Sequence, residues 1–567
     1  MADKPWLKHY DPGVPGTLSP YPETILMDIL ADTVKQRPQH PVLLFKGTRL
    51  SGLTLEQLST DLATALVAMG VKKQDRVALL LPNCPQAVIG HFGIWKAGAI
   101  VVPINPFYSD AELERLLNEC GAEIVIVLSP FYIKVKSMQA RTSIRTVIAS
   151  SIKEYLPPVP RLLFTLTKEK KNGHRISLQS GDVWLQDLLR QYANSSSLDI
   201  ASSPRDPAIL VFSGGTTGVP KGAVGSHQAL VISGMQLHAW LSVVMKDWDD
   251  IIMQVLPLFH VYGNIGVMAT ALVGHNPLAL VPDPRDLKDV IGTIRRVRPA
   301  FLPAVPTFFV ALLNHPLVKS GKVDFTSMKL CISGAAPLLS ETKEEFEKLT
   351  GGCLVEGYSL TEAMMAATIN PVKGICKAGS VGLPLPDVEV RIASMETGED
   401  SLPHGKTGEI LIKAPQLMLE YWSRPAETSE VIRNGWLYTG DIGYMDEEGY
   451  LFIVGRKKDL IKAGGFQVWP HEIEEVIATI PAVAEVSAAG VPDPYRGETV
   501  KVWVVPQPGQ QVTEEEILAV CREKLTPYKV PRLIEFRESL PKNMIGKVLR
   551  RKLVEEHKLK QRADTNA

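Results

Sequence analysis

The stretch Phe-Ser-Gly-Gly-Thr-Thr-Gly-Val-Pro-Lys-Gly, residues 212–222, directly follows the apolar run Ala-Ile-Leu-Val at 208–211. The apolar run predicts a buried strand, so the glycines fall where that strand delivers a loop to the surface. Glycine lets backbone amides approach an anion closely, while hydroxyl and ammonium groups add donors and charge. The residues with these properties are Ser213, Gly214, Gly215, Thr216, Thr217, Gly218 and Lys221. The loop is therefore predicted to hold a polyphosphate.

The order of residues in this loop indicates which class of phosphate-binding loop it belongs to. A Walker loop places Gly-Lys-Ser/Thr at the start of a helix, with the hydroxyl group on magnesium. Here Pro220, which has no N–H donor, precedes the lysine, and Gly222 follows it. A P-loop nucleotide hydrolase is therefore disfavoured. Taken alone, the loop is also compatible with a surface turn rich in glycine and threonine, so other motifs have to decide.

The composition favours a cytosolic protein that acts on small molecules. The 567 residues carry 61 basic and 61 acidic side chains, so no net charge favours nucleic acid as a partner. The six cysteines are scattered, without Cys-x-x-Cys pairs or zinc-ligand spacing, which is typical of reduced thiols. The N-terminus lacks the apolar segment of a secretory signal.

One long apolar stretch needs a separate interpretation. Residues 251–281 contain no Asp, Glu, Lys or Arg, which is long enough to span a bilayer. Prolines, glycines, histidines and asparagines interrupt the stretch, however. We therefore expect a buried strand, a loop, a buried helix and another strand, and no membrane span.

Short apolar strands alternate with amphipathic helices over most of the chain before Gly455. Examples are expected strands at 76–81, 100–103 and 124–127, with helices at 87–96 and 111–120 between them. This alternation predicts an α/β protein whose large N-terminal domain is built on mostly parallel sheets. After Gly455 the pattern predicts a smaller α+β module. Its expected elements are a helix at 470–480, strands at 483–491 and 499–505, a helix from a Thr513/Glu516 capping box to about Leu525, and a strand at 531–536.

Residues 150–203 interrupt the alternation and are predicted to be an inserted excursion. They contain a Pro-rich segment, the basic cluster at 168–171 and a serine run at 195–197. The combination of Leu162, Leu163 and Phe164 with lysines is compatible with contact to a membrane surface. A solvated loop is the favoured interpretation, because charge runs of this size usually face water.

Six further segments join the opening loop in a fixed order. They are Leu-Pro-Leu-Phe-His at 256–260, Ser-Gly-Ala-Ala-Pro-Leu at 333–338, Glu-Gly-Tyr-Ser-Leu-Thr-Glu at 356–362, Gly-Trp-Leu-Tyr-Thr-Gly-Asp at 435–441, Gly-Arg-Lys-Lys-Asp-Leu-Ile-Lys at 455–462, and Pro-Lys-Asn-Met-Ile-Gly-Lys at 541–547. Over nearly the whole chain this order resembles the acyl-adenylate-forming (AMP-binding) superfamily, most closely the bacterial long-chain fatty acid–CoA ligases. The resemblance implies a large domain at 1–455, a hinge at 456–461 and a small mobile C-terminal domain at 462–567.

The resemblance also implies a two-step, AMP-forming reaction that uses ATP, Mg²⁺ and CoA. A fatty acid carboxylate attacks the α-phosphorus of ATP, which releases pyrophosphate and leaves an acyl-adenylate. The CoA thiol then displaces AMP. Because the first step brings two anions together, the site must neutralise charge and hold an in-line geometry.

By this resemblance, one group of residues contacts the nucleotide. In addition to the loop residues named above, the group contains Gly334, Ala335, Tyr358, Asp441 and Arg456. Tyr358 is expected to stack on adenine, Asp441 to accept hydrogen bonds from the ribose hydroxyls, and Arg456 to contact the ribose or a phosphate. Ser359 stands where relatives usually carry glycine, which is expected to tighten the adenine pocket.

A second group is expected to act on the reacting atoms. Thr361 is expected to bond near the α-phosphate and Glu362 to coordinate magnesium, a hard cation that prefers oxygen ligands. Lys547 is expected to reach from the small domain to the substrate carboxylate and the α-phosphate, where its charge stabilises the transition state. His260 is expected to form a wall of the acyl pocket rather than to act as a base, because a carboxylate nucleophile is already ionised at neutral pH.

A third group is expected to serve the second step. Lys458 matches the interdomain hinge of the resembling enzymes, in which the small domain rotates after adenylation. Gly464 and Gly465 would then line a tunnel for the pantetheine arm of CoA, because glycine lets the arm pass close to the backbone.

Several alternatives stay open at this level. The acceptor could be a carrier protein instead of free CoA, and the acid could be aromatic. A nucleotide- or acyl-binding protein without turnover is disfavoured by the presence of Lys547, Glu362 and Asp441. Luciferase-like oxygenation shares the same motifs. Acyl chain length, a homodimer and peripheral membrane contact are not decided by the sequence, because small changes in a pocket wall move the chain-length optimum.

Overall fold

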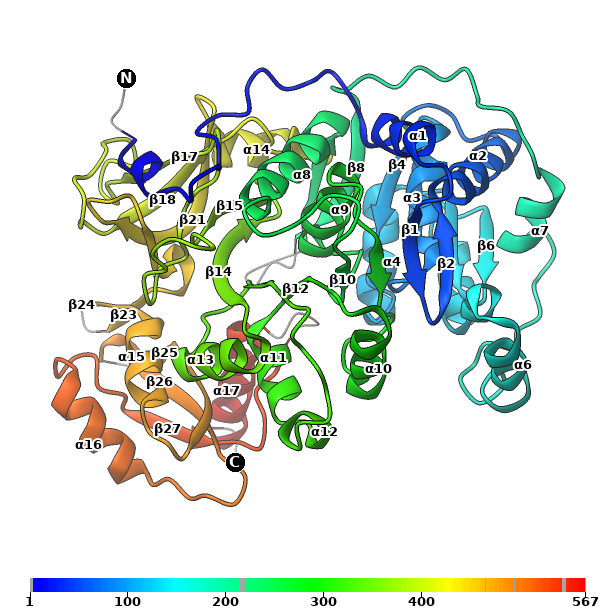
Figure 1. Cartoon of the computed structure of the whole chain (residues 1–567). Helices are drawn as coiled ribbons and strands as arrows, with labels where there is room; N and C mark the ends of the chain where they lie inside the picture. The colour runs from blue at the N-terminus through cyan, green and yellow to red at the C-terminus, as the bar shows by residue number, and fades with distance from the viewer. Residues whose placement is uncertain (1–3, 214–219, 464–465, 494, 543–546, 566–567) are drawn as a thin grey trace.

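The computed structural model describes residues 4–213, 220–463, 466–493, 495–542 and 547–565. Figure 1 shows a large part, coloured blue to yellow, and a smaller orange-to-red part at the lower left. The predicted α/β class with a large N-terminal and a small C-terminal domain is confirmed. Four sheets organise the chain, two in the body of the large part, one at its upper left and one in the small part.

The first sheet carries the glycine-rich loop. Its eight strands follow the order β19-β9-β8-β4-β3-β5-β6-β7, and the neighbours from β8 to β7 are all parallel. The strands are β3 (Arg76–Leu80), β4 (Ile100–Pro103), β5 (Ile124–Leu128), β6 (Thr146–Ser150), β7 (Val183–Trp184), β8 (Pro207–Phe212), β9 (Gly222–Ser226) and β19 (Glu420–Tyr421). Strands β8 and β9, which flank the glycine-rich loop in the sequence, are antiparallel neighbours.

The second sheet carries most of the other predicted site segments. Its nine strands follow the order β16-β15-β14-β13-β12-β10-β11-β1-β2, with a parallel centre and antiparallel edges. The strands are β1 (Pro41–Phe45), β2 (Thr48–Ser51), β10 (Ile252–Gln254), β11 (Leu278–Leu280), β12 (Phe301–Ala304), β13 (Leu330–Ser333), β14 (Cys353–Leu360), β15 (Met365–Ile369) and β16 (Leu383–Pro384).

Helices cover the faces of both sheets. Helix α3 is buried along nearly its whole length, and one continuous apolar cluster includes residues of both sheets. The helices are α1 (Leu26–Gln36), α2 (Gly52–Ala68), α3 (Pro85–Lys96), α4 (Asp110–Cys120), α5 (Tyr132–Met138), α6 (Pro158–Thr167), α7 (Leu185–Gln191), α8 (His227–Leu241), η5 (Tyr262–Ala269), α9 (Thr270–Val273), α10 (Leu287–Val297), α11 (Pro306–Leu313), α12 (Pro316–Lys319), α13 (Ser340–Thr350) and α14 (Pro425–Val431). Short 3-10 segments are η1 (Pro5–His9), η2 (Ser129–Phe131), η3 (Gln139–Arg141), η4 (Ile152–Tyr155) and η6 (Lys457–Asp459).

The third sheet departs from the predicted alternation. It contains β17 (Glu389–Ala393), β18 (Gly408–Lys413), β20 (Ile432–Arg433), β21 (Trp436–Met445) and β22 (Leu451–Arg456), all paired antiparallel. The expectation of α/β alternation up to Gly455 is therefore wrong for this segment. Antiparallel neighbours need no crossover helix between consecutive strands, and within the described residues 389–456 a single helix, α14, lies between β19 and β20.

The C-terminal module has the predicted elements and, in addition, the short strands β23 and β24 and the helix α17. Its sheet order is β24-β23-β26-β25 with β27 on β26, and Thr513 and Glu516 form the expected capping box. The elements are β23 (Ile461–Ala463), β24 (Phe466–Val468), α15 (Pro470–Ala478), β25 (Val483–Asp493), β26 (Gly497–Pro506), α16 (Glu514–Lys524), β27 (Leu533–Phe536) and α17 (Arg550–Thr565). The sequence pattern gave no prediction for helix α17.

The apolar stretch 251–281 forms β10, a loop, the π-helical segment η5 followed by α9, and β11, as predicted. Among the described helices, none has the length and apolar character needed to cross a membrane. The excursion at 150–203 is only partly irregular. It contains α6, β7 and α7, so the favoured interpretation of a solvated loop is wrong for Leu162, Leu163 and Phe164, which lie in α6.

Candidate active site

The ends of the glycine-rich loop meet where β8 and β9 pair. The Ser213 backbone N–H donates to the carbonyl oxygen of Lys221 over 2.8 Å, and the Lys221 N–H donates to Ser213 Oγ over 3.3 Å. These bonds hold the two ends of the loop together. The predicted contacts Gly214, Gly215, Thr216, Thr217 and Gly218 lie outside the described residues.

Strand β14 places two predicted residues in succession. Tyr358 lies within the strand and is buried, and its hydroxyl group donates to Asp441 Oδ2 over 2.5 Å. Burial and the Asp441 charge raise the pKa of Tyr358 far above its usual value, so the phenol stays a neutral donor. Thr361 and Glu362 follow in a turn beyond the end of the strand.

Asp441 joins Tyr358 to Arg456. Asp441 on β21 and Arg456 on β22 are direct partners in an antiparallel register. The Arg456 Nε donates to Asp441 Oδ1 over 2.7 Å. The Asp441 carboxylate raises the pKa of the guanidinium, and burial opposes this effect. The structure thus brings three predicted nucleotide contacts into one hydrogen-bonded group.

Glu362 is held by a residue that the sequence did not indicate. The Tyr421 hydroxyl donates to Glu362 Oε1 over 2.6 Å, and Tyr421 lies on β19, which pairs with β9 next to the glycine-rich loop. Burial and the Glu362 charge raise the pKa of Tyr421, so it remains a donor. The Lys221 ammonium lies 4.9 Å from the centre of the Tyr421 ring and forms an ion pair with Glu427. Tyr421 therefore connects Glu362 with the end of the loop.

The donor set fits a magnesium ion that takes most of its ligands from phosphates and water. Glu362 Oε2 makes no hydrogen bond within the described part of the chain. The same residues contain no cluster of three His, Cys, Asp or Glu side chains that could cage a metal. Mg²⁺ is usually bound by one or two carboxylates together with substrate phosphates, and Glu362 is a suitable single ligand.

Lys547 comes from the small part of the chain to the Asp441–Arg456 pair. Burial and the nearby Arg456 charge lower the pKa of Lys547 to about 8, and Asp441 partly offsets them. Lys547 also lies close enough to His260 for its charge to act there. Together with burial, the larger effect, that charge lowers the pKa of His260 to about 4. At neutral pH Lys547 is therefore mostly charged and His260 neutral.

An ion-pair chain fixes the segment that carries Lys547. The Arg550 guanidinium, on α17, donates to Asp459 over 3.1 Å and to Glu474 on α15 over 2.6 Å. Asp459 belongs to η6, between the third sheet and the sheet of the small part. Arg550 thus ties the residues just after Lys547 to this connecting segment.

Gly334 and Tyr262 of η5 line the same pocket as Tyr358. A Cβ atom on Gly334 would lie 2.9 Å from the Tyr262 ring, so only glycine permits this packing. Tyr262, Gly334, Tyr358 and Met365 line a common pocket, and Ala335 beside it is exposed. His260 precedes η5, and its Nδ1 accepts a hydrogen bond from the Tyr262 N–H over 3.2 Å.

The remaining predicted residues lie apart from this group. Lys458 is exposed in η6, after the end of the third sheet. Gly464 and Gly465 fall outside the described residues. Tyr421, Glu427, Tyr262 and Arg550 are the site residues that sequence reasoning missed. None of them stands in a recognisable motif, and each is placed by a contact with a distant segment.

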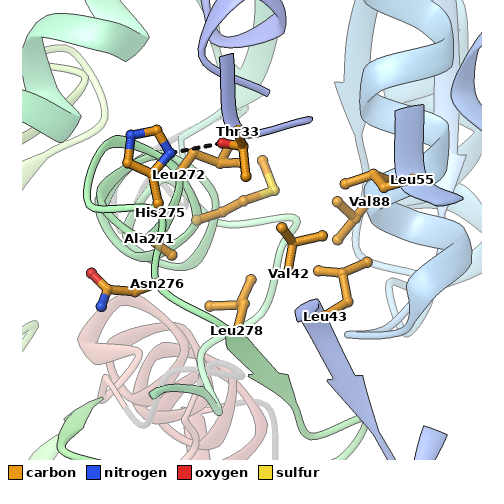
Figure 2. Close-up of a pocket in the computed structure, with 11 residues that line it drawn as sticks. Thr33, Val42, Leu43, Leu55, Val88, Ala271, Leu272, His275, Asn276 and Leu278 are labelled. Atoms are coloured by element: carbon orange, nitrogen blue, oxygen red, sulfur yellow. Dashed lines mark hydrogen bonds between the residues drawn. The ribbon is translucent and has the colours of Figure 1, made fainter. Parts of the chain in front are cut away.

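A second pocket lies away from these residues, between α1, α2 and β1 on one side and α9 and β11 on the other (Figure 2). Most of its lining is aliphatic, and the Thr33 hydroxyl lies 2.7 Å from His275 Nδ1 at its polar edge. It contains none of the predicted site residues.

Two family models match the chain. The model of the AMP-binding enzyme matches residues 30–422, and that of the AMP-binding enzyme C-terminal domain matches residues 472–547. A long-chain-fatty-acid–CoA ligase of Bacillus subtilis is 40% identical, and one of Escherichia coli is 36% identical, each over 98% of both chains. A 4-coumarate–CoA ligase of potato, Solanum tuberosum, is 31% identical over 88% of this chain and 87% of its own.

Solved structures agree in fold. ATP-bound MatB of Rhodopseudomonas palustris superimposes with a TM-score of 0.80 at 29% identity, over 94% of this chain and 99% of its own. A fatty acyl CoA synthetase of Mycobacterium tuberculosis gives a TM-score of 0.72 at 28% identity, over 94% and 98%.

Proposed function

The chain belongs to the AMP-binding enzyme family, and on this premise we propose that it is an AMP-forming fatty acid–CoA ligase that prefers long-chain acids. The similarity to long-chain-fatty-acid–CoA ligases extends over 98% of both chains, whereas the 4-coumarate–CoA ligase matches less of the chain at lower identity. The structural observation that carries the proposal is the position of Lys547 beside Asp441, Arg456 and His260. A cation there suits an anionic nucleophile that attacks an anionic phosphate.

In the first step, a carboxylate oxygen of the fatty acid bonds to the α-phosphorus of ATP, and the bond to pyrophosphate breaks. The Lys547 ammonium stabilises the charge that develops on the α-phosphate and carboxylate oxygens. The Asp441 carboxylate accepts hydrogen bonds from the ribose, and Arg456 neutralises that carboxylate. Ser213 and Lys221 anchor the ends of the loop that holds the leaving phosphates. Magnesium, when bound at Glu362, neutralises phosphate charge.

In the second step, the CoA sulfur bonds to the acyl carbon and AMP leaves. We propose that residues 456–461 act as the hinge, with Lys458 at its centre, so that residues 1–455 and 462–567 move as two domains. The rotation withdraws Lys547 and brings Gly464 and Gly465 to the CoA path. The exposed position of Lys458 in η6, the segment that connects the third sheet to the small part, supports this role.

A panel of acids tests the proposed function. We expect AMP release with medium- and long-chain fatty acids that depends on CoA, little release with acetate, and acyl-CoA as the second product. The measurement is AMP and acyl-CoA formation for acids from acetate to oleate, with coumarate included. Turnover of coumarate alone would favour the aromatic-acid alternative. Acyl-adenylate that forms with fatty acids but is not consumed by CoA would favour a carrier-protein acceptor.

Tyr421→Phe should weaken the use of magnesium. The variant removes the donor that orients Glu362, and loss of such a supporting bond typically costs about 10-fold to 100-fold in metal affinity or activity. We expect adenylation to fall by about 10-fold and the Mg²⁺ concentration for half-maximal rate to rise. Tyr444→Phe, on β21 of the third sheet, where the ring stacks on Phe452, is the control. A normal Mg²⁺ dependence in Tyr421→Phe would show that Tyr421 does not position Glu362.

A further inference from the structure

Helix α6 presents an aliphatic face that nothing in the described chain covers. Val159, Leu162, Leu163 and Leu166 are 69%, 60%, 56% and 73% exposed. Their spacing of three, four and seven residues places them on one side of the helix. In Figure 1, α6 lies at the lower right of the molecule, on the opposite side from the small C-terminal part. We call these four side chains the α6 face.

The helix is held in place by its other side. The Phe164 ring packs edge-on against the His174 ring, with 5.2 Å between the ring centres. His174 is buried, and its Nδ1 lies 2.9 Å from the Ser129 hydroxyl at the end of the first sheet's β5. These contacts attach the Phe164 side of α6 to the end of the first sheet and leave the α6 face directed away from it.

The segment that contains this helix is rich in basic side chains. Residues 152–176 contain six Lys or Arg and two Glu, in a chain whose net charge is zero. Both carboxylates are already paired, Glu169 with Lys153 and Glu154 with Arg161. Within the part of the chain that the structure describes, the other cations form no ion pair. These are Lys168, Lys170, Lys171 and Arg175.

We propose that the α6 face and the four exposed cations that follow α6 in the chain form a docking surface for an anionic lipid bilayer. Aliphatic side chains on one side of a helix insert below the headgroups, and neighbouring Lys and Arg attract anionic lipids. A protein partner suits the surface less well, because the α6 face consists of aliphatic side chains, whereas the anchors of protein interfaces are mostly aromatic side chains and arginine. The surface is separate from the candidate active site, so bilayer binding does not depend on the proposed function.

Vesicle binding of the full-length protein tests the proposal. We expect the protein to sediment with phosphatidylglycerol vesicles at low salt and much less with phosphatidylcholine vesicles. Leu162→Glu/Leu166→Glu should reduce binding at least about 10-fold, because the carboxylates resist insertion and are repelled by anionic lipid. Lys168→Gln/Lys170→Gln/Lys171→Gln should remove the preference for the anionic lipid. Ile375→Glu/Leu559→Glu changes two exposed side chains elsewhere and should bind like the wild type.

Other readouts separate the competing explanations. An unchanged thermal unfolding temperature of the Leu162→Glu/Leu166→Glu variant and of the triple lysine variant would show that the fold is intact. Two results would overturn the proposal. In one, the variants at Leu162/Leu166 and at Lys168/Lys170/Lys171 bind vesicles as strongly as the wild type. In the other, the control variant loses binding to the same extent. A different result would also overturn the proposal. If the wild type does not bind vesicles and is a dimer in light scattering, and Leu162→Glu/Leu166→Glu is a monomer, then the α6 face contacts a second copy of the chain. If the proposed function holds, the same variant should raise the KM for vesicle-borne oleate and leave soluble octanoate unaffected.

Discussion

Lys547→Ala should abolish adenylate formation while largely sparing thioester formation from a preformed acyl-adenylate. The substitution removes the ammonium group that reaches the Asp441–Arg456 pair from the other domain. Loss of one preorganised electrostatic contact to a transition state typically costs about 100-fold to 1,000-fold in rate. The second step does not use this charge if the small domain has rotated, so its rate should change by only about 2-fold to 3-fold, within the scatter of ordinary surface substitutions.

The two half-reactions can be measured separately. Fatty-acid-dependent exchange of pyrophosphate into ATP reports the first, and acyl-CoA formation from synthetic acyl-AMP reports the second. Lys552→Ala, an exposed lysine on α17, is the matched control and should leave both unchanged. Equal losses in both half-reactions would contradict the assignment and point to general damage of the C-terminal segment.

The pH dependence of the first step sharpens this test. Because the pKa of Lys547 is lowered to about 8, the amine is charged below that pH and neutral above it. The kcat/KM for ATP, which reports the free enzyme, should therefore fall as the pH rises above about 8. Lys547→Arg keeps its charge at every accessible pH and should lose this alkaline decline, whatever its absolute rate.

The sequence predicted those parts of the structure that depend on local patterns. Apolar runs located β3, β4 and β5, and the Thr513/Glu516 pair marked the start of α16. Local patterns do not report which distant segments meet. The bond between Tyr421 and Glu362 joins residues 59 apart, and the ion pair between Asp459 and Arg550 joins residues 91 apart. The spacing of residues within each segment gives no indication of either contact.

Two predictions from the sequence were wrong because they also depended on contacts between segments, here for whole strands and helices. The third sheet was missed because antiparallel neighbours need no helix between consecutive strands, so the segment lacks the regular strand–helix alternation that indicates a parallel sheet. Helix α6 was missed because its first turn contains Pro158 and Pro160, which are typical of irregular segments but are tolerated where a helix starts. In both cases the deciding information was the packing partner of a segment, which composition does not contain.

Asp441→Asn should weaken ATP use by about 10-fold to 100-fold, because charge-assisted hydrogen bonds to a carboxylate are worth about 1.5 to 3 kcal/mol. The amide keeps the size of the side chain and can still accept the bond from Tyr358. It loses the charge that balances Arg456, whose guanidinium is about one-third exposed beside the buried carboxylate. The KM for ATP should rise, and the free energy of unfolding should fall by about 1 to 2 kcal/mol, less than for a fully buried pair.

A double-mutant cycle separates binding from folding in this prediction. Arg456→Met keeps the length of the side chain without its charge, and Asp441→Asn/Arg456→Met removes both charges together. We expect the double variant to unfold at about the same denaturant concentration as the less stable of the two single variants. The reason is that the second change removes a charge that the first change has left unpaired. ATP use should not recover in the double variant, since the carboxylate that accepts the ribose hydroxyls is still missing. Additive losses of stability would show that the ion pair does not couple the two strands, and a normal KM for ATP in Asp441→Asn would remove Asp441 from the nucleotide site.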